Sequence, residues 1–234
     1  MVDYLQVNYF NDEYKENAYP QKLCDYLIDT IIRPHFSGEI KGLKLLDMGS
    51  GKGNHLIGFH RRNFNVKGMD FRPECLSIFK EIDIRDCNME TSKFPFLDET
   101  FDVVFSKSVI EHIQNIDNVF TESFRVLKRG GLAIIMTPDW GTQYKTFWDD
   151  YTHVKAWTRK SLQNVMKIFG FVQVNSTLFN QLPLLWKYPQ LKFLYDVVSL
   201  LPEAWKWKDK DEKIHRPFIR FSKEKMILAV GAKP

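Results

Sequence analysis

Short apolar runs of strand length alternate with stretches of helical spacing between residues 41 and 137, and this alternation restricts the fold more than any other feature of the sequence. Several of the runs are apolar on consecutive residues, which is typical of parallel strands covered on both faces. Strand–helix alternation of this kind predicts an α/β fold with an open, doubly wound and mostly parallel sheet. The predicted strands are 43–48, 66–70, 82–87, 101–105, 132–137 and, at the end of the chain, 225–231.

Three predicted helices each end at a residue type that breaks helices. The first has apolar residues at four-residue spacing and is expected to stop at Pro34. The second carries Leu127 on its apolar stripe and is expected to stop at the glycine pair 130–131, and the third ends at Gly170. In a doubly wound sheet ligands bind beyond the carboxyl ends of the strands, so we expect the functional residues there.

The charge and cysteine content exclude several classes of protein. Thirty-three bases against 29 acids give a net charge of +4, which is too small an excess for a nucleic-acid-binding stripe. The cysteines, Cys24, Cys75 and Cys87, form no Cys-x-x-Cys pair, so we expect reduced thiols rather than disulfides or a zinc cluster. The first residues do not resemble a signal peptide, and no apolar run is long enough to span a membrane, which predicts a cytoplasmic protein.

A glycine-rich turn follows the first predicted strand, with the sequence Asp47-Met-Gly49-Ser-Gly51-Lys-Gly53. Glycines at a strand–helix junction allow a sharp turn and the close approach of a ligand, although alone they also fit an ordinary tight turn. The spacing differs from the G-x-G-x-x-G of dinucleotide-binding loops, and Asp47 would repel a pyrophosphate but attract a cation. Asp70 ends the second strand, where a carboxylate can accept both ribose hydroxyls. The set predicts a site for a nucleoside that carries positive charge and no phosphate.

Four further segments follow the glycine-rich turn in chain order. Residues 86–88 end the third strand, 94–104 lead into the fourth, 125–131 lead into the fifth and 232–234 close the chain. Together with the turn they resemble the class I S-adenosylmethionine-dependent methyltransferases, in particular the methyltransferase type 11-like family. The resemblance implies a Rossmann-like methyltransferase fold with a seven-stranded sheet and helical additions, and it implies S-adenosylmethionine as the cofactor.

The resemblance also implies cofactor contacts for individual residues. The loop residues would line the methionine moiety, Asp70 would bind the ribose and Phe71 would lie beside the adenine. Asp86 and Cys87 would face the adenine edge, and Ser106, at the end of the fourth strand, would offer its backbone near the sulfonium. The full set implied in this way is Asp47, Gly49, Ser50, Gly51, Asp70, Phe71, Asp86, Cys87 and Ser106.

An acceptor hydroxyl or protonated amine must lose a proton during methylation, so a general base is expected beyond the strand ends. Glu111 and His112 follow the fourth strand directly, and they resemble the end of a Glu-x-x-Glu-His pattern that binds a divalent metal in some O-methyltransferases. Ser108 stands at the first position of that pattern, so no metal is predicted, although His153 could complete a Glu-His-His set. A structural role in bracing the next helix is the alternative for Glu111 and His112.

His153 lies in the segment 149–158, which resembles a D-x-T-H-x-x-x-x-T sequence found after the fifth strand in methyltransferases of surface-polysaccharide and small-metabolite pathways. Glu111, His112 and His153 are therefore the candidate catalytic residues. The segment, and the absence of an Asn-Pro-Pro-Tyr motif after the fourth strand, favour methyl transfer to oxygen of a small-molecule or saccharide acceptor. The alternatives are N-methylation of a small metabolite, RNA methylation and an NAD-dependent oxidoreductase.

The chain divides into four parts. Residues 1–40 form a helical lead-in that could cover the acceptor site, and residues 41–181 form the cofactor-binding core. Residues 182–217 are a helical insert, and residues 218–234 supply the last strand of the core. Tryptophans and lysines flank an amphipathic stretch of the insert, which predicts a lid over the acceptor, a dimer interface or a membrane-surface contact through residues 182–208.

Overall fold

The structure is a computed structural model, and it describes residues 18–71, 82–208 and 215–234 of the chain. Cys75, the first part of the N-terminal lead-in and a short part of the insert are not within these ranges, so the predictions made for them lie outside the described residues. Cys24 and Cys87 are buried free thiols. Among the described residues, no helix is both long enough and apolar enough to cross a membrane.

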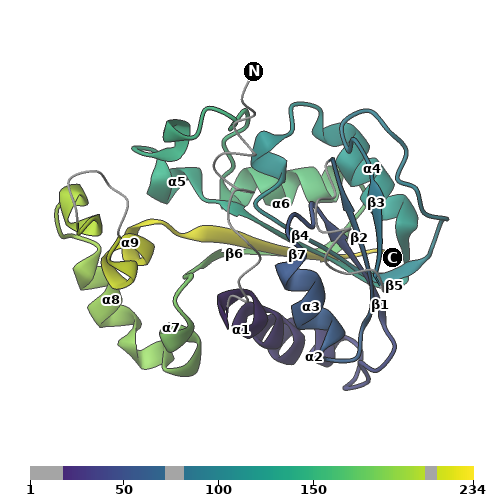
Figure 1. Ribbon diagram of the computed structural model, residues 1–234, viewed down its shortest axis with the longest axis horizontal. Helices are drawn as coiled ribbons and strands as arrows, with labels where there is room; N and C mark the ends of the chain where they lie inside the picture. Colours follow the sequence, from purple (N-terminus) through teal and green to yellow (C-terminus); the bar gives the residue numbers. More distant parts are fainter. Residues whose placement is uncertain (1–17, 72–81, 209–214) are drawn as a thin grey trace.

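A seven-stranded sheet forms the centre of the molecule, in the order β3-β2-β1-β4-β5-β7-β6 (Figure 1). Neighbouring strands are parallel except at β7, which runs antiparallel to both β5 and β6. The predicted doubly wound, mostly parallel sheet is confirmed. The strands are β1 (Lys44–Met48), β2 (Asn65–Asp70), β3 (Asp83–Asp86), β4 (Phe101–Lys107), β5 (Leu127–Pro138), β6 (Val172–Phe179) and β7 (Met226–Ala232).

Helices cover both faces of this sheet (Figure 1). One face carries a nearly continuous helix made of α1 (Ala18–Leu27), η2 (Ile28–Ile32) and α2 (Arg33–His35), together with α3 (Asn54–His60). The other face carries α4 (Ile116–Val126) and α6 (Arg159–Ile168). The remaining short helices are η4 (Ile110–His112), α5 (Trp140–Gln143), η5 (Phe147–Asp149), α7 (Pro183–Lys187), η6 (Pro189–Leu191), α8 (Lys192–Val198), η7 (Glu203–Lys206) and α9 (Pro217–Lys223).

Two hydrophobic layers explain why the central strands are apolar on consecutive residues. In β4, Val104 belongs to the layer beneath α4 and α6, whereas Val103 and Phe105 belong to the layer beneath α1 and α3. Alternate side chains of a strand point to opposite faces of the sheet, so both faces of β4 need apolar residues. All three side chains are fully buried.

Two predicted helix ends differ from the structure. The helix expected to reach the glycine pair 130–131 ends at Val126, because Leu127 has extended backbone angles and pairs with Phe101 as the first residue of β5. Leu127 is buried in either conformation, so its apolar character did not distinguish helix from strand. The N-terminal helix continues through Pro34 to His35, because Pro34 stands near the start of the short α2 turn, where a free amide is not needed.

The C-terminal part of the chain contains more helix than predicted. Most of α9 lies within residues 218–234, which were predicted only as the last strand, and β7 follows it. In the insert, α8 buries Tyr195 completely. Its opposite side leaves Phe193 75% exposed and Leu200, just beyond the helix, 83% exposed, so the predicted apolar stripe is only partly buried.

Candidate active site

The predicted cofactor residues meet at one edge of the sheet, where β1, β2, β3 and β4 end side by side. Met48 pairs with Met69 on one side and with Ser106 on the other, and Asp70 pairs with Asp86. The fold thereby brings together residues that are far apart in the sequence. This edge is the carboxyl end of the strands, as the doubly wound topology predicts.

The glycine-rich loop turns sharply between β1 and α3. Gly49 has a φ of 75°, and its amide and that of Ser50 donate hydrogen bonds to the Met69 carbonyl at 2.8 and 3.1 Å. Gly51 has a φ of 49° and donates its amide to Oδ2 of Asp70 at 2.8 Å. The positive φ values favour glycine at these positions. Asp70 therefore anchors the loop from the end of the neighbouring strand.

Close packing against Val109 adds a second requirement for glycine in the loop. A Cβ atom at Gly49 would lie 2.2 Å from Cγ2 of Val109, which is far inside van der Waals contact. Val109 stands two positions before Glu111 in the segment that follows β4. The glycine-rich loop and the predicted catalytic segment are therefore in direct contact.

Asp47 is a buried carboxyl whose environment favours a cation. Its side chain is 1% exposed, and its Oδ2 atom has no hydrogen-bond partner in the part of the chain that the structure describes. Burial, reinforced by the negative charge of Asp70, raises the pKa of Asp47 to about 8. A buried polar atom without a partner is unfavourable, and a positively charged group placed beside it would relieve this.

The residues predicted to surround an adenine combine an exposed ring with a neutral thiol. Phe71 is 53% exposed just after β2. The Cys87 amide donates to the Asp70 carbonyl at 2.9 Å. Burial, with smaller effects from Asp86 and Glu122, raises the pKa of Cys87 to about 11, so the thiol is neutral near neutral pH. Ser106 donates its hydroxyl to the Met48 carbonyl at 3.1 Å, so that hydroxyl supports β1.

The structure also brings together the three predicted catalytic residues. Glu111 and His112 lie in η4 after β4, and His153 lies in the loop after η5. The amides of Val154 and Lys155 donate to the Glu111 carbonyl at 2.8 and 3.1 Å, which joins the two segments. The ring centres of His112 and His153 are 4.8 Å apart. We call Glu111, His112 and His153 the Glu-His-His group.

Each side chain of the Glu-His-His group has a hydrogen bond that orients it. Thr137, near the end of β5, donates its hydroxyl to Oε2 of Glu111 at 2.9 Å. Nδ1 of His112 lies 2.9 Å from the hydroxyl of Thr152, and Nδ1 of His153 lies 2.5 Å from the Phe147 carbonyl. Burial raises the pKa of Glu111 to about 7. Burial, together with the charge of His153, lowers the pKa of His112.

The sequence reasoning missed the residues that orient this group. Thr152 donates to Oδ1 of Asp150 at 2.6 Å, so Asp150, Thr152 and His112 form a hydrogen-bonded chain. The available signal was the D-x-T-H pattern itself, whose first and third positions are Asp150 and Thr152. Thr137 had no such signal, because only the fold places the end of β5 beside η4.

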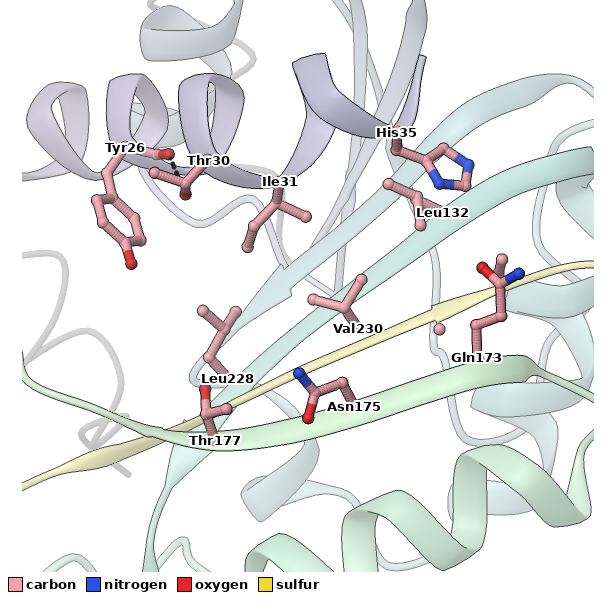
Figure 2. Close-up of a pocket in the computed structure, with 12 residues that line it drawn as sticks. Tyr26, Thr30, Ile31, His35, Leu132, Gln173, Asn175, Thr177, Leu228 and Val230 are labelled. Atoms are coloured by element: carbon pink, nitrogen blue, oxygen red, sulfur yellow. Dashed lines mark hydrogen bonds between the residues drawn. The ribbon is translucent and has the colours of Figure 1, made fainter. Parts of the chain in front are cut away.

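A groove on the other side of the molecule is separate from these residues. It has a volume of about 390 Å³ and lies between the helix formed by α1 and η2 and the strands β5, β7 and β6 (Figure 2). Figure 2 shows Ile31 facing Leu228 and Val230 across it, with Asn175 on the β6 side. None of its lining residues belongs to the predicted site.

The order of the seven strands, with an antiparallel last strand and a glycine turn guarded by a buried carboxyl, defines the class of Rossmann-like methyltransferases that use S-adenosylmethionine. Residues 16–176 match the family model described as a methyltransferase domain. The chain therefore belongs to this methyltransferase family. The alternative of an NAD-dependent oxidoreductase is abandoned.

Curated relatives in this family are similar to only part of the chain. Squalene methyltransferase 1 from Botryococcus braunii is 30% identical over 129 residues, which cover 49% of this chain and 32% of that protein. The ubiquinone biosynthesis O-methyltransferase from Pelagibacter ubique is 29% identical over 106 residues, covering 42% of this chain and 43% of that protein. The chain thus spans less than half the length of either of these two relatives.

Solved structures share the fold at low sequence identity. A putative sarcosine dimethylglycine methyltransferase from Galdieria sulphuraria has a TM-score of 0.64 at 16% identity, covering 91% of this chain and 85% of that one. Phosphoethanolamine N-methyltransferase 2 from Haemonchus contortus, in complex with S-adenosyl-L-methionine, has a TM-score of 0.62 at 16% identity, covering 99% of this chain and 59% of that one.

Proposed function

We propose that this methyltransferase transfers the methyl group to a hydroxyl oxygen of a small-molecule or saccharide acceptor. The observation that supports the proposal is the Glu-His-His group, which lies next to the cofactor loop through the contact between Val109 and Gly49. A hydroxyl must lose a proton as it is methylated, and this group offers imidazole nitrogens and a carboxylate to assist that loss.

The glycine-rich loop is the proposed cofactor site. S-adenosylmethionine supplies a methyl group on a positively charged sulfur, from which it departs readily. Asp47 offers that ligand a buried carboxylate oxygen that has no hydrogen-bond partner among the described residues. Space for the close approach of a ligand is found at Gly51, where the position of a Cβ atom has no described neighbour within 4 Å. Asp70 would accept the ribose hydroxyls while it holds the amide of Gly51. These residues bind and orient, which is where most of the acceleration of a methyl transfer can arise.

N-methylation of a small metabolite is the second candidate. The relatives include methyltransferases named for oxygen and for nitrogen acceptors, so the family alone does not choose between them. The segment after β4 of this chain reads Lys-Ser-Val-Ile-Glu-His and has no Asn-Pro-Pro-Tyr motif. Glu111 and His112 of this segment, with His153 from the loop after η5, can assist removal of a proton from a hydroxyl acceptor.

The acceptor class can be tested with S-adenosylmethionine labelled in its methyl group. The protein is incubated with the label and with fractions of a cell extract, and the labelled product is analysed by mass spectrometry. We expect label in a low-molecular-weight or saccharide fraction, as an O-methyl group. Label that is released by ribonuclease, or an N-methyl product, would contradict the proposal while leaving the family assignment intact.

Replacing the ribose-binding carboxylate should weaken cofactor binding strongly. Asp70→Ala removes the proposed contact with two hydroxyls and also the acceptor of the Gly51 amide. We expect the Kd for S-adenosylmethionine, measured by titration calorimetry, to rise at least about tenfold. Asp25→Ala is the control, because Asp25 is an exposed residue of α1 paired with Arg62. An unchanged Kd in the Asp70 variant would show that Asp70 does not bind the ribose.

Cofactor affinity should increase with pH because Asp47 must lose its proton to pair with a cation. With a pKa of about 8, the carboxyl is mostly protonated in the ligand-free protein at neutral pH. Affinity should rise about tenfold from about pH 6 to about pH 7 and level off above about pH 8. Asp47→Asn cannot titrate and should show a weaker and flatter profile. Identical profiles for the two proteins in calorimetry would contradict the pairing.

The raised pKa of Asp47 also makes the stability of the ligand-free protein depend on pH. The folded state binds the Asp47 proton more tightly than the unfolded state, so this group stabilises the fold fully below its unfolded pKa. The contribution is lost as the pH rises from about 4 to about 8. A bound cationic ligand opposes the loss by favouring the ionised carboxylate.

A further inference from the structure

The Glu-His-His group has the geometry of a metal site. One donor atom from each of Glu111, His112 and His153 can be chosen so that all three lie within 4.8 Å of one another. The donors come from η4 and from the loop after η5, and the hydrogen bonds from Val154 and Lys155 to the Glu111 carbonyl keep the two segments together.

The hydrogen bonds fix which nitrogen of each histidine carries its proton. The partner of His153 Nδ1 is the Phe147 carbonyl, which can only accept, so Nδ1 is the protonated nitrogen. The Thr152 hydroxyl donates its own proton to Asp150, so its oxygen must accept from His112 Nδ1. In both neutral rings Nε2 therefore keeps a lone pair. Metal-binding histidines are held in this way, with the other ring nitrogen donating to a carbonyl, a carboxylate or a similar acceptor.

Burial and a hydrogen bond also fix the position of the Glu111 carboxylate. Glu111 is 1% exposed, and the hydroxyl of Thr137 fixes it through Oε2. Two charges of opposite sign, those of Lys107 and Asp150, act on this carboxylate. The group thus presents two imidazole nitrogens and one carboxylate, with Glu111 buried and the two histidines half-buried. Two histidines and one carboxylate form a common donor set for first-row divalent metals, and this set can leave a coordination position open.

We propose that Glu111, His112 and His153 bind a divalent transition-metal ion of the zinc class, with Asp150, Thr152 and Thr137 as positioning residues. An ion held by these three side chains could take an acceptor oxygen as a further ligand. This part of the inference rests on the proposed function and makes it more specific. A hydroxyl bound to such an ion loses its proton more easily than a free hydroxyl.

The test measures metal binding directly. Full-length protein is freed of metal with a chelator and titrated with Zn²⁺ in calorimetry, and Co²⁺ is added separately because its visible absorption reports the ligand geometry. We expect one ion per chain and a tetrahedral or five-coordinate Co²⁺ spectrum. Glu111→Gln, His112→Ala and His153→Ala should each weaken Zn²⁺ binding by at least about 100-fold, and Thr152→Val by about 10- to 100-fold.

His60→Ala is the matched control, because His60 is an exposed histidine at the far end of α3 from the loop. It should bind Zn²⁺ like the wild type, and circular dichroism of each metal-free variant shows whether its fold is kept. Absence of Zn²⁺ binding, or equal binding by the wild type and the three ligand variants, would overturn the proposal.

The metal inference and the proposed function can fail separately. Zn²⁺ binding that depends on the three ligands, together with label only on nitrogen acceptors, would keep the site and refute the O-methylation. Labelled O-methyl product formed at the same rate by metal-free protein would refute a metal role and keep the proposed function.

Discussion

Alanine at either His112 or His153 is expected to slow methyl transfer by at least about 100-fold, the lower range for loss of a group that assists proton removal. The Kd for S-adenosylmethionine should stay within about twofold of the wild type, because neither side chain belongs to the glycine-rich loop. The effect should appear in single-turnover measurements with saturating labelled cofactor and the acceptor fraction. A slower methyl transfer is expected whether the imidazoles act on the hydroxyl directly or through an ion.

The double variant separates a shared role from two independent ones. If His112 and His153 act on the same acceptor oxygen, combining the two substitutions should cost little more than either alone. Thr152→Val, which keeps both imidazoles but removes the hydrogen-bonded chain to Asp150, should give an intermediate loss. Wild-type rates in both single variants would rule out the catalytic role of the group.

The placement of the proposed cofactor residues at one edge of the sheet could be predicted from sequence, because it depends on strand ends. Asp47, Asp70, Asp86 and Ser106 each stand at the end of a predicted strand, and parallel strands end at the same edge of a sheet. A pattern of strands and helices is therefore enough to place the four side by side. Their contacts were not predictable in the same way: the bond from Gly51 to Asp70 depends on the backbone angles of the loop.

The arrangement of the Glu-His-His group depends on contacts between segments that are far apart in the sequence. His112 and Thr152 are 40 positions apart, and their hydrogen bond exists because the loop after η5 folds back over η4. Thr137 reaches Glu111 only because β5 lies next to β4 in the sheet. A sequence pattern could propose Glu111, His112 and His153 one by one, but not the bonds that fix their tautomers.

Helix ends and the insert were less predictable because apolar character does not determine backbone conformation. Leu127 is buried as the first residue of β5 and would have been buried as the last residue of a helix. In the insert, Tyr195 rather than the aliphatic stripe became the buried side of α8. Tyr195 packs against Phe218 of α9, with ring centres 5.4 Å apart, and these two residues are far apart in the chain.

A buried ion cluster joins the insert to the last part of the core. Lys206 in η7 is 2% exposed, and its ammonium lies 2.9 Å from Glu224 and 3.0 Å from Glu203. Glu224 also accepts from Arg220 of α9 at 2.6 Å. Burial alone would lower the pKa of Lys206, but the hydrogen bonds and charges of the two glutamates raise it overall. The ammonium is therefore charged, and it compensates two carboxylates that pack against it.

Removing that ammonium should destabilise the protein more than removing any exposed lysine. Lys206→Met keeps most of the side-chain volume but leaves Glu224 nearly buried with one partner fewer, so we expect a loss of about 3 kcal/mol. At about 2–4 °C per kcal/mol for a chain of this size, Tm should fall by about 6–12 °C. Lys192→Met, which breaks an exposed pair with Asp196, should lower Tm by less than about 2 °C. Adding Glu224→Gln to Lys206→Met should recover part of the loss, because it removes the uncompensated charge. Equal melting curves for the two lysine variants in calorimetry would show that the cluster does not hold the insert to the core.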